Sequence, residues 1–434
     1  MPTLTRRHAL TALGAAVAAP AIGVAPAAAV GGHGDRPRRR VVLIDVDGFD
    51  PRFLDGEYAD VHPLPRIRAL RASGASGTAA GTFSSYSNSS RTSTATGTHP
   101  DVHRNAGYYV DPATGLAVSQ ERFIEPGVET IAHTLRRQGR TGAYVQWYAV
   151  QDYGAGYGDV EQLYTQPGGG MTARVDDAVA LLSGGPVSSG GTQVQLPEIP
   201  DFLAVYGSEV DGWLHSNGFA GQGLVDALEE TDTQVGRLLD TIEDLGLAES
   251  TTVLLTGDHA QREWTEPLLP ELIAALEETG GTMSVVGAGQ TADLTADIVL
   301  YAAPRTADVT FRTPLARGEL ARLTRRIERI EGVAAVYGER ELRRLRAADK
   351  LGDLVVEPSE PFHFSTLQDG ALRGSHGGVE EMEVPLVLAG AGVRRGARLA
   401  RPSLTDVAPT ICHLLGVGAP SSADGRVLRE ALRH

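Results

Sequence analysis

The sequence predicts an α/β fold in which helices cover both faces of a largely parallel sheet. Short apolar runs alternate with amphipathic helical patterns through most of the 434 residues, which is the order that parallel strands and crossover helices produce. A second observation is that residues able to bind metal follow several of these runs. A third is a change of pattern between residues 280 and 360, which predicts a small α+β insertion.

The predicted strands are short and apolar. The first is Val41–Ile44, which follows three arginines and leads into Asp45-Val46-Asp47-Gly48. Continuous apolar runs of this length are typical of strands that are buried on both faces. Further strands are predicted at 142–145, 202–206, 252–255 and 385–388.

The clearest predicted helix lies between residues 224 and 245. Its apolar residues recur every three or four positions, and acidic residues occupy the opposite face. Within the insertion, the sequence predicts strands at 296–301 and 333–337 and an arginine-rich helix around 320–330. The Gly/Ser-rich stretch 183–191 predicts an exposed loop.

The first 29 residues differ from the rest of the chain. Thr5-Arg6-Arg7-His8 precedes a weakly apolar, alanine-rich run that ends in Ala27-Ala28-Ala29. These are the parts of a signal peptide, and paired arginines are typical of the twin-arginine export route; a disordered basic tail is the alternative. We therefore expect an exported protein with a signal peptide at 1–29, a hydrolase core at 30–279 and 361–434, and a cap-like subdomain at 280–360.

The formal net charge is −15 at pH 7, and removal of residues 1–29 makes it more negative. Such a surface repels polyanions, so a long nucleic acid is not expected as a partner. A small anionic ester is compatible, because divalent cations would dominate the local field. No later apolar stretch is long enough to span a membrane, Cys412 is the single cysteine, and nothing indicates an oligomeric state.

Seven residues with metal-binding side chains follow predicted strands or lie beside glycine. Because the carboxyl ends of parallel strands meet at one edge of a sheet, we expect these side chains to converge. Carboxylate, imidazole and hydroxyl groups are the ligands that a pair of zinc-like ions needs for attack on a phosphorus or sulfur ester. The seven are Asp47, Ser87, Asp211, His215, Asp258, His259 and His376.

Ser87 begins a Ser/Thr-rich segment that predicts the start of a helix. A hydroxyl group there lies at the positive end of the helix dipole, which favours an alkoxide and a bound anion. Arg91, one turn later, is a candidate to hold a sulfate or phosphate oxygen. An ordinary capping serine is the alternative. Asp45 points to the same face as Asp47 and is a candidate accessory group.

With these motifs the chain resembles the alkaline phosphatase superfamily, and most closely its nucleotide pyrophosphatase/type I phosphodiesterase branch. The resemblance covers nearly all of the chain after the N-terminal segment. It implies an alkaline-phosphatase-like three-layer sandwich and the hydrolysis of phosphate esters. Its motifs are 43–49, 96–103, 209–215, 256–259 and 374–377, together with 406–410, 414–416 and 424–425 near the C-terminus.

The resemblance also implies roles for the seven residues. In the family the nucleophile lies nine residues before the threonine of a Thr-Gly pair, which points from Thr96 to Ser87. One metal would be held by the nucleophile with Asp47, Asp258 and His259, and the other by Asp211, His215 and His376. Two divalent ions, with Zn²⁺ as the expected metal, and a phospho-serine intermediate follow.

Two departures from the branch concern the groups beside the metals. The usual nucleophile is threonine, whereas Ser87-Asn88-Ser89-Ser90-Arg91 is similar to a sulfatase motif in which Ser89 replaces the proline. The branch binds a phosphoryl oxygen through an asparagine, but Tyr108 holds the expected position, so Asn105 is the candidate donor.

Three functions stay open from the sequence. The leading hypothesis is an exported two-metal phosphodiesterase or nucleotide pyrophosphatase, with Ser87, Arg91 and Asn105 as catalytic groups. A sulfatase or phosphomonoesterase of the same superfamily is the second, and a non-catalytic metal-binding surface protein is the third. Some aromatic side chains could stack on a substrate, although core packing is favoured for them. These are Trp147, Tyr153, Tyr157 and Trp213.

Overall fold

The computed structural model describes residues 38–367 and 369–433, so the predicted signal peptide lies outside the described residues. The main feature is an eight-stranded sheet with the strand order β21-β2-β20-β10-β1-β9-β5-β6. Its strands are β1 (Arg40–Val46), β2 (Ala75–Ala80), β5 (Gly142–Val145), β6 (Gln162–Thr165), β9 (Phe202–Gly207), β10 (Thr251–Gly257), β20 (Glu383–Gly390) and β21 (Ala397–Arg398).

This sheet is parallel from β6 through to β10, and β20 is the one antiparallel strand among the eight. The predicted α/β class and the largely parallel sheet are therefore confirmed. The antiparallel direction of β20 follows from its connection: the chain enters it after returning from the second sheet, not from a crossover helix.

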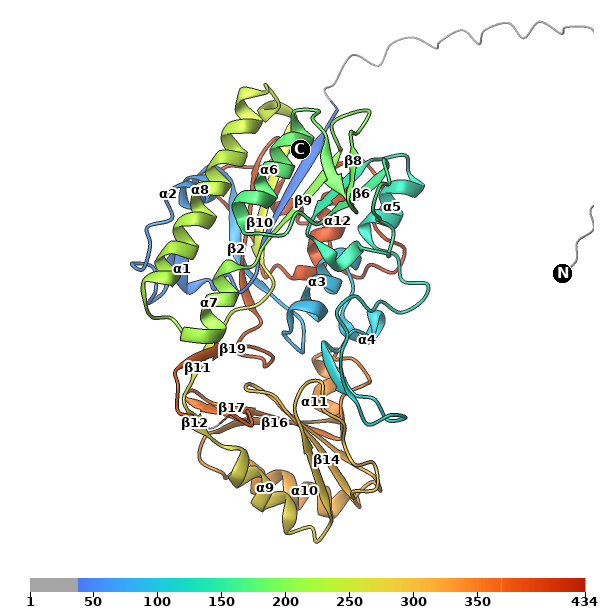
Figure 1. Cartoon of the computed structure of the whole chain (residues 1–434), viewed down its shortest axis with the longest axis vertical. Coiled ribbons are helices and arrows are strands. Elements are labelled where there is room, and N and C mark those ends of the chain that lie inside the picture. The colour runs from blue at the N-terminus through green and yellow to red at the C-terminus, as the bar shows by residue number, and fades with distance from the viewer. Residues whose placement is uncertain (1–37, 368, 434) are drawn as a thin grey trace, which may run out of the picture. The chain divides into compact units, whose positions relative to one another are not determined.

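Helices cover both faces of the central sheet, which gives three layers (Figure 1). Val42, Ile44 and Val46 of β1 pack against one helical layer, whereas Val41 and Leu43 face the other. This alternation follows from the two-residue period of a strand. The first layer contains α2 (Pro65–Ser73), α6 (Met171–Leu182), α7 (Glu209–Asn217) and α8 (Gln222–Asp244); the second contains α3 (Ser87–Thr96), α5 (Ile131–Arg137) and α12 (Val407–Leu414).

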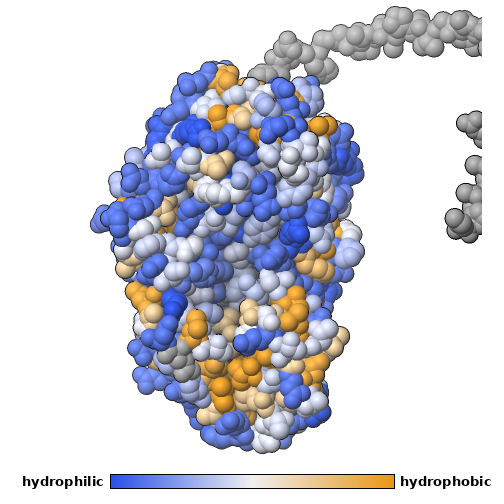
Figure 2. Space-filling model, in the orientation of Figure 1, coloured by the Kyte–Doolittle hydropathy of each residue, from blue (hydrophilic) through white to orange (hydrophobic). Residues whose placement is uncertain are grey.

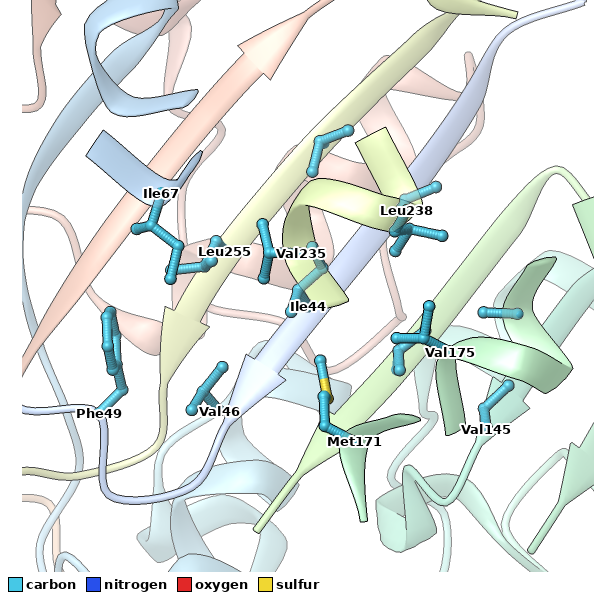
Figure 3. Packing of buried hydrophobic residues seen from close by; sticks show 14 of the residues in the cluster. Ile44, Val46, Phe49, Ile67, Val145, Met171, Val175, Val235, Leu238 and Leu255 are labelled. Carbon is cyan, nitrogen blue, oxygen red and sulfur yellow. The ribbon is translucent and has the colours of Figure 1, made fainter. Parts of the chain in front are cut away.

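Figure 3 shows the first of these interfaces, where Ile44 and Leu255 from the sheet meet Val235 and Leu238 of α8. Each such fully buried side chain stabilises the fold by roughly 1.5–3 kcal/mol. The rigid sheet that results holds the polar residues at its carboxyl edge in place.

A second, five-stranded sheet has the order β13-β14-β15-β17-β16. Leu300, Val309 and Val356 on one of its faces pack against α9 (Leu269–Glu277) and α10 (Arg317–Ile327). Figure 2 shows hydrophobic residues gathered on the surface of this region, whereas the surface over the central sheet is mainly hydrophilic. The strands are β13 (Met283–Val286), β14 (Ile298–Ala302), β15 (Ala307–Phe311), β16 (Val333–Gly338) and β17 (Leu354–Pro358).

The other face of the second sheet contacts the segment that leads into α3. Tyr301 of β14 belongs to the same apolar cluster as Tyr86, and Val355 of β17 packs with Phe83. The short hairpin of β3 (Tyr108–Val110) and β4 (Ala117–Ser119) contributes Tyr108 and Ala117 to the first of these clusters. All five strands fall within residues 280–360, and the insertion contacts the chain just before the predicted nucleophile.

Two local expectations need correction. The stretch 183–191, expected to be a loop, contains β7 (Val187–Ser189), which pairs with β8 (Thr192–Val194) because Val187 and Val194 bury their side chains against the core. The arginine-rich helix ends at Ile327, so Ile330 lies in the turn that follows. Among the described residues, no helix is both long enough and apolar enough to cross a bilayer.

The second sheet contains a buried carboxyl group whose ionisation should make stability depend on pH. Burial raises the pKa of Asp308 from its ordinary value of 3.8 to about 7. The folded protein therefore holds this proton where the unfolded chain has lost it, so stability falls as the pH rises from about 4 to 7. We expect Asp308→Asn to reduce this fall by up to about 4 kcal/mol, measured by urea denaturation at several pH values. Parallel curves for both proteins would contradict the assignment.

Candidate active site

Three neighbouring strands of the central sheet are followed by residues whose side chains are able to bind metal. Asp47 follows β1, and Asp258 and His259 follow β10. Asp211 and His215 lie one turn apart on α7, which follows β9. The strands are adjacent in the order β10-β1-β9 and parallel, so their carboxyl ends share one edge and the five side chains converge there.

Ser87 and His376 reach the same edge by other routes. Ser87 is the first residue of α3, with Tyr86 in the capping position and no capping hydrogen bond from a side chain, so the ordinary capping role does not apply. His376 follows β19 (Arg373–Ser375), which pairs with β11 (Arg262–Trp264) just after His259. The rings of His259 and His376 are stacked with centroids 3.4 Å apart.

The first cluster of ligand atoms is formed by Asp211, His215 and His376. His215 Nε2 lies 3.3 Å from Asp211 Oδ1 and 3.2 Å from His376 Nε2. The distance from His376 Nε2 to Asp211 Oδ1 is 3.8 Å. Three potential ligand atoms therefore surround one small volume.

The second cluster is formed by Asp47, Asp258, His259 and Ser87. His259 Nε2 lies 3.3 Å from Asp47 Oδ1 and 3.3 Å from Asp258 Oδ2. Ser87 Oγ is 3.0 Å from His259 Nε2 and 3.5 Å from Asp47 Oδ1. His259 also lies within reach of Asp211 and His376, but its short contacts to Asp47 and Asp258 assign it to this cluster.

All three histidine rings present Nε2 to the clusters. Nδ1 of His215, His259 and His376 lies 3.2, 3.0 and 2.8 Å from a backbone carbonyl oxygen, respectively. A carbonyl oxygen only accepts hydrogen bonds, so Nδ1 carries a proton and Nε2 is directed into the clusters. A second-nitrogen hydrogen bond of this kind is the usual support for a metal-bound histidine.

The two clusters fit the geometry of zinc. Ligand atoms around a tetrahedral Zn²⁺ lie about 3.3 Å apart, because the bonds to nitrogen and oxygen are about 2.0–2.2 Å long. The distances above, from 3.0 to 3.8 Å, are of this size. Asp258 Oδ2 is buried, and its contacts among the described residues are the charged groups of Arg91 at 2.9 Å and His259 at 3.3 Å.

Arg91 lies beneath the second cluster and does not line the cavity. Its guanidinium group is fully buried, with Nη2 at 2.8 Å from Asp47 Oδ2 and 2.9 Å from Asp258 Oδ2. Nε is 3.2 Å from Asp45 Oδ2, and the group stacks over the Tyr206 ring at 4.2 Å. The expected contact with a substrate oxygen has no geometric support, because three carboxylates already surround the cation.

Burial has the largest effect on the pKa values of the groups in the site. Burial, with the charge of Asp47 reinforcing it and Arg91 opposing it, raises the pKa of Asp258 to about 7. Burial lowers the pKa of His259, but the charges of Asp258 and Asp47 outweigh this effect and raise it to about 9. Burial, with His259 and His215 adding to it, holds the pKa of His376 well below its ordinary range, so this ring is neutral, as a metal ligand must be.

Asn105 lies away from the cavity. Its side-chain amide donates to the carbonyl oxygens of Gln120 and Phe123, and its Oδ1 accepts from the amide of Gly107. The residue is fully buried, and its hydrogen bonds hold together the turn before β3. Contact with substrate is therefore not supported for Asn105, whereas Tyr108, at the position expected for the asparagine, lines the cavity.

A cavity of about 880 Å³ opens beside the two clusters, and Ser87, Asp211, His215 and His376 lie in its wall. This volume is in the range of small-molecule sites. The second sheet also lines the cavity through Tyr301 and the residues after it. The aromatic residues that line the cavity are Tyr86, Tyr108, Tyr148, Tyr164 and Tyr301.

These aromatic residues are not the ones considered from the sequence. Trp147 is buried and donates a 2.7 Å hydrogen bond to Asp45, so it belongs to the core. Trp213 lies on α7 and donates to the carbonyl oxygen of Ala220. A residue missed altogether is Tyr206, whose hydroxyl group donates to Asp47 Oδ2 at 2.6 Å. Its position one residue before the end of β9 was the available signal.

The chain matches the family model described as type I phosphodiesterase/nucleotide pyrophosphatase over residues 41–378. The chain therefore belongs to the type I phosphodiesterase/nucleotide pyrophosphatase family, as the sequence motifs predict. The matched range contains all seven residues of the two clusters.

Two curated relatives that match part of the chain carry the name of the same family. Over 72 residues the chain is 36% identical to ectonucleotide pyrophosphatase/phosphodiesterase family member 1 of mouse and of rat. This segment is 16% of the chain and spans only 8% of the length of those relatives.

Solved structures of ectonucleotide pyrophosphatase/phosphodiesterase 5 share the fold. The human protein superposes with a TM-score of 0.68 at 17% identity, covering 91% of this chain and 100% of that one. The murine protein, as the inactive T72A form in complex with AMP, gives 0.66 at 16% identity, covering 88% and 96%. The alkaline-phosphatase-like fold expected from the sequence is thereby confirmed.

The position of Arg91 predicts a large loss of stability when its charge is removed. Arg91→Met leaves three buried carboxylates without their cation, so we expect the free energy of unfolding to fall by about 3–5 kcal/mol. Urea denaturation in the presence of a chelator measures this. Arg136 is the matched control, because its pairs with Asp159 and Glu161 are exposed; Arg136→Met should cost less than about 1 kcal/mol. Equal losses in the two variants would contradict the role given to Arg91.

Proposed function

We propose that the protein is an exported two-metal hydrolase that cleaves phosphodiester or nucleotide pyrophosphate bonds through a phospho-serine intermediate on Ser87. The observation that carries this proposal is the place of Ser87. Its hydroxyl oxygen is 3.0 Å from His259 Nε2 in the second ligand cluster, and the residue also lines the cavity. Ser87 is thus the nucleophilic side chain that both a metal and a substrate can reach.

The proposed ligands are those of the two clusters. Asp47, Asp258, His259 and Ser87 would hold one zinc ion, and Asp211, His215 and His376 the other. When bound, the ions supply a lowered pKa for the serine hydroxyl group and positive charge for the ester oxygens. The fit of the ligand distances to tetrahedral zinc supports this assignment.

The residues of the chain then perform a two-step substitution. Ser87 Oγ forms a bond to phosphorus, and the bond between phosphorus and the leaving-group oxygen breaks, so the phosphoryl group is transferred to the serine. A water molecule cleaves the phospho-serine bond in the second step and restores the hydroxyl group. The start of α3 favours negative charge on Ser87 Oγ through the helix dipole.

A nucleotide or a similar aromatic phosphate ester is the proposed substrate class. The cavity is large enough for such a ligand, and five tyrosines line it. Aromatic rings contribute favourable stacking to bases. The AMP found with murine ectonucleotide pyrophosphatase/phosphodiesterase 5 supports a nucleotide for this chain as well. The acidic chain disfavours a long polyanion.

A sulfatase is less well supported. The Ser87–Arg91 segment is similar to a sulfatase motif, but Arg91 contacts carboxylates instead of the cavity. Sulfatases typically use one calcium-like ion. A sulfatase would therefore leave the cluster of His215 and His376 unexplained. Export through the twin-arginine route is proposed from Arg6-Arg7, and retention of the protein in the cytoplasm would contradict it.

A substrate panel tests the reaction class. The purified protein is freed of metal, supplied with Zn²⁺, Mn²⁺ or Ca²⁺, and assayed on bis-p-nitrophenyl phosphate, the p-nitrophenyl ester of thymidine monophosphate, p-nitrophenyl phosphate and p-nitrophenyl sulfate. We expect the highest kcat/KM for the two diesters in Zn²⁺. Dominant turnover of the sulfate ester would favour the sulfatase. No turnover with any of the three metals would favour a non-catalytic metal-binding protein.

Removal of the nucleophile tests the mechanism. We expect Ser87→Ala to lower kcat on the best diester by at least about 10³-fold, because the variant lacks the attacking oxygen. Acid quenching during turnover should trap a phosphoryl group on the peptide that contains Ser87 in the wild type. Ser188→Ala, on the exposed side of the β7–β8 hairpin, is the control and should leave kcat unchanged. Full activity of Ser87→Ala would reject the mechanism.

A further inference from the structure

The turn between β14 and β15 of the second sheet contains a buried arginine that contacts the segment after His376. Arg305 is completely buried although it lies in a connection between two strands. Burying a guanidinium group without partners is costly, so its contacts identify what the turn is built to hold.

Arg305 binds two consecutive glutamates. Its Nε donates to Glu381 Oε1 at 2.8 Å, and Nη2 donates to Glu380 Oε2 at 3.1 Å. Glu381 is completely buried, whereas Glu380 is partly exposed. Two ion pairs therefore connect the second sheet to the segment 376–381.

Carboxylates in turn hold the backbone of this segment. Glu381 Oε2 accepts from the amide of Gly378 at 2.8 Å. Glu357, buried on β17, accepts from the amides of Val379 and Glu380 at 2.9 and 3.1 Å. A side chain at Gly378 would collide with both Glu357 and Glu381. The three amides after Gly377 thus have partners supplied or oriented by the second sheet.

The same segment positions His376. Gly377 donates its amide to Ser85 Oγ at 3.0 Å, and Ser85 Oγ donates to the carbonyl oxygen of Gly378 at 2.7 Å. His376 Nδ1 contacts the carbonyl oxygen of Ser85 at 2.8 Å, which directs Nε2 toward Asp211 and His215. The backbone on which His376 depends is therefore fixed from one side by Ser85 and from the other by the second sheet.

A neighbouring contact reaches the nucleophile. Thr306, next to Arg305, forms a 2.8 Å hydrogen bond with the hydroxyl group of Tyr86, and Tyr86 directly precedes Ser87. The turn between β14 and β15 therefore contacts both the segment that carries Ser87 and the segment that carries His376. Neither of these residues directly follows a strand of the central sheet.

We propose that Arg305 is a positioning residue for the metal cluster of Asp211, His215 and His376, so that the second sheet sets the affinity of one of the two ions. This inference rests on the proposed two-metal function. It goes beyond a role of the insertion as one wall of the cavity, because Arg305 acts through Glu381 and Glu380 on His376 without contacting a ligand atom.

Zinc titration of the full chain tests the proposal. Metal-free wild type, Arg305→Lys and Arg312→Lys are titrated with Zn²⁺ against a chromophoric chelator. We expect Arg305→Lys, which keeps the charge but loses the planar fork, to bind one of two ions about 10- to 100-fold more weakly. Arg312 follows β15 in the same sheet and pairs with Asp297 at the surface, so Arg312→Lys should bind both ions as the wild type does.

A second pair of variants identifies the affected ion. In a His215→Ala background the ion held by that cluster is already weakened, so Arg305→Lys should add little to the loss. If Arg305→Lys does not fold, as judged by circular dichroism, Glu380→Gln replaces it, because Glu380 is partly exposed and the change still removes one ion pair. The weakening is then expected in the same direction.

The outcomes separate the two proposals. Wild-type protein that binds fewer than two zinc ions would overturn the proposed function and this inference with it. Two ions of wild-type affinity in Arg305→Lys and in Glu380→Gln would overturn the inference alone. A lower unfolding temperature of Arg305→Lys with unchanged zinc affinity would have the same meaning, because it would show a purely structural ion pair.

Discussion

The concentration of buried carboxylates at the carboxyl edge of the central sheet is the constraint on which the rest of the structure depends. Asp45, Asp47 and Asp258 lie within 3.2 Å of one guanidinium group, and Asp211 is close by. Charges taken out of water require partners, because desolvation costs several kcal/mol for each ion. Arg91 compensates part of this charge, and the carboxylates lie beside histidine nitrogens with which they could hold metal ions.

The second sheet has a closer connection to this edge than its place in the sequence suggests. Its outer face packs on α9 and α10, but its inner face meets Phe83 and Tyr86, just before Ser87. A wall of the cavity and the support of the His376 segment therefore come from the same element. A change in the second sheet would therefore affect both the cavity wall and the segment that carries His376.

The sequence was sufficient for the fold class and for the residues that converge. Apolar runs that end in Asp47 and Asp258 predict both the strands and their polar ends, because a parallel sheet brings carboxyl ends together. The directions of Arg91 and Asn105 could not be predicted in this way. Arg91 lies one turn after Ser87, so its side chain could point from the helix either into the cavity or toward the sheet. It points toward the sheet because it pairs with carboxylates that lie far away in the sequence. The backbone turn before β3 likewise engages Asn105.

The amino-acid sequence by itself determined the family, the parallel sheet and the set of seven candidate metal ligands, because these depend on local patterns and on their order along the chain. The tertiary structure alone decided which side chains face the cavity, which cation lies beneath the carboxylates, and how the second sheet holds His376. Arg305 and Glu381 are 76 residues apart, and nothing in the local pattern of either predicts their partner. Buried charged groups pair with the opposite charges that lie near them in space, and this proximity exists only in the folded chain.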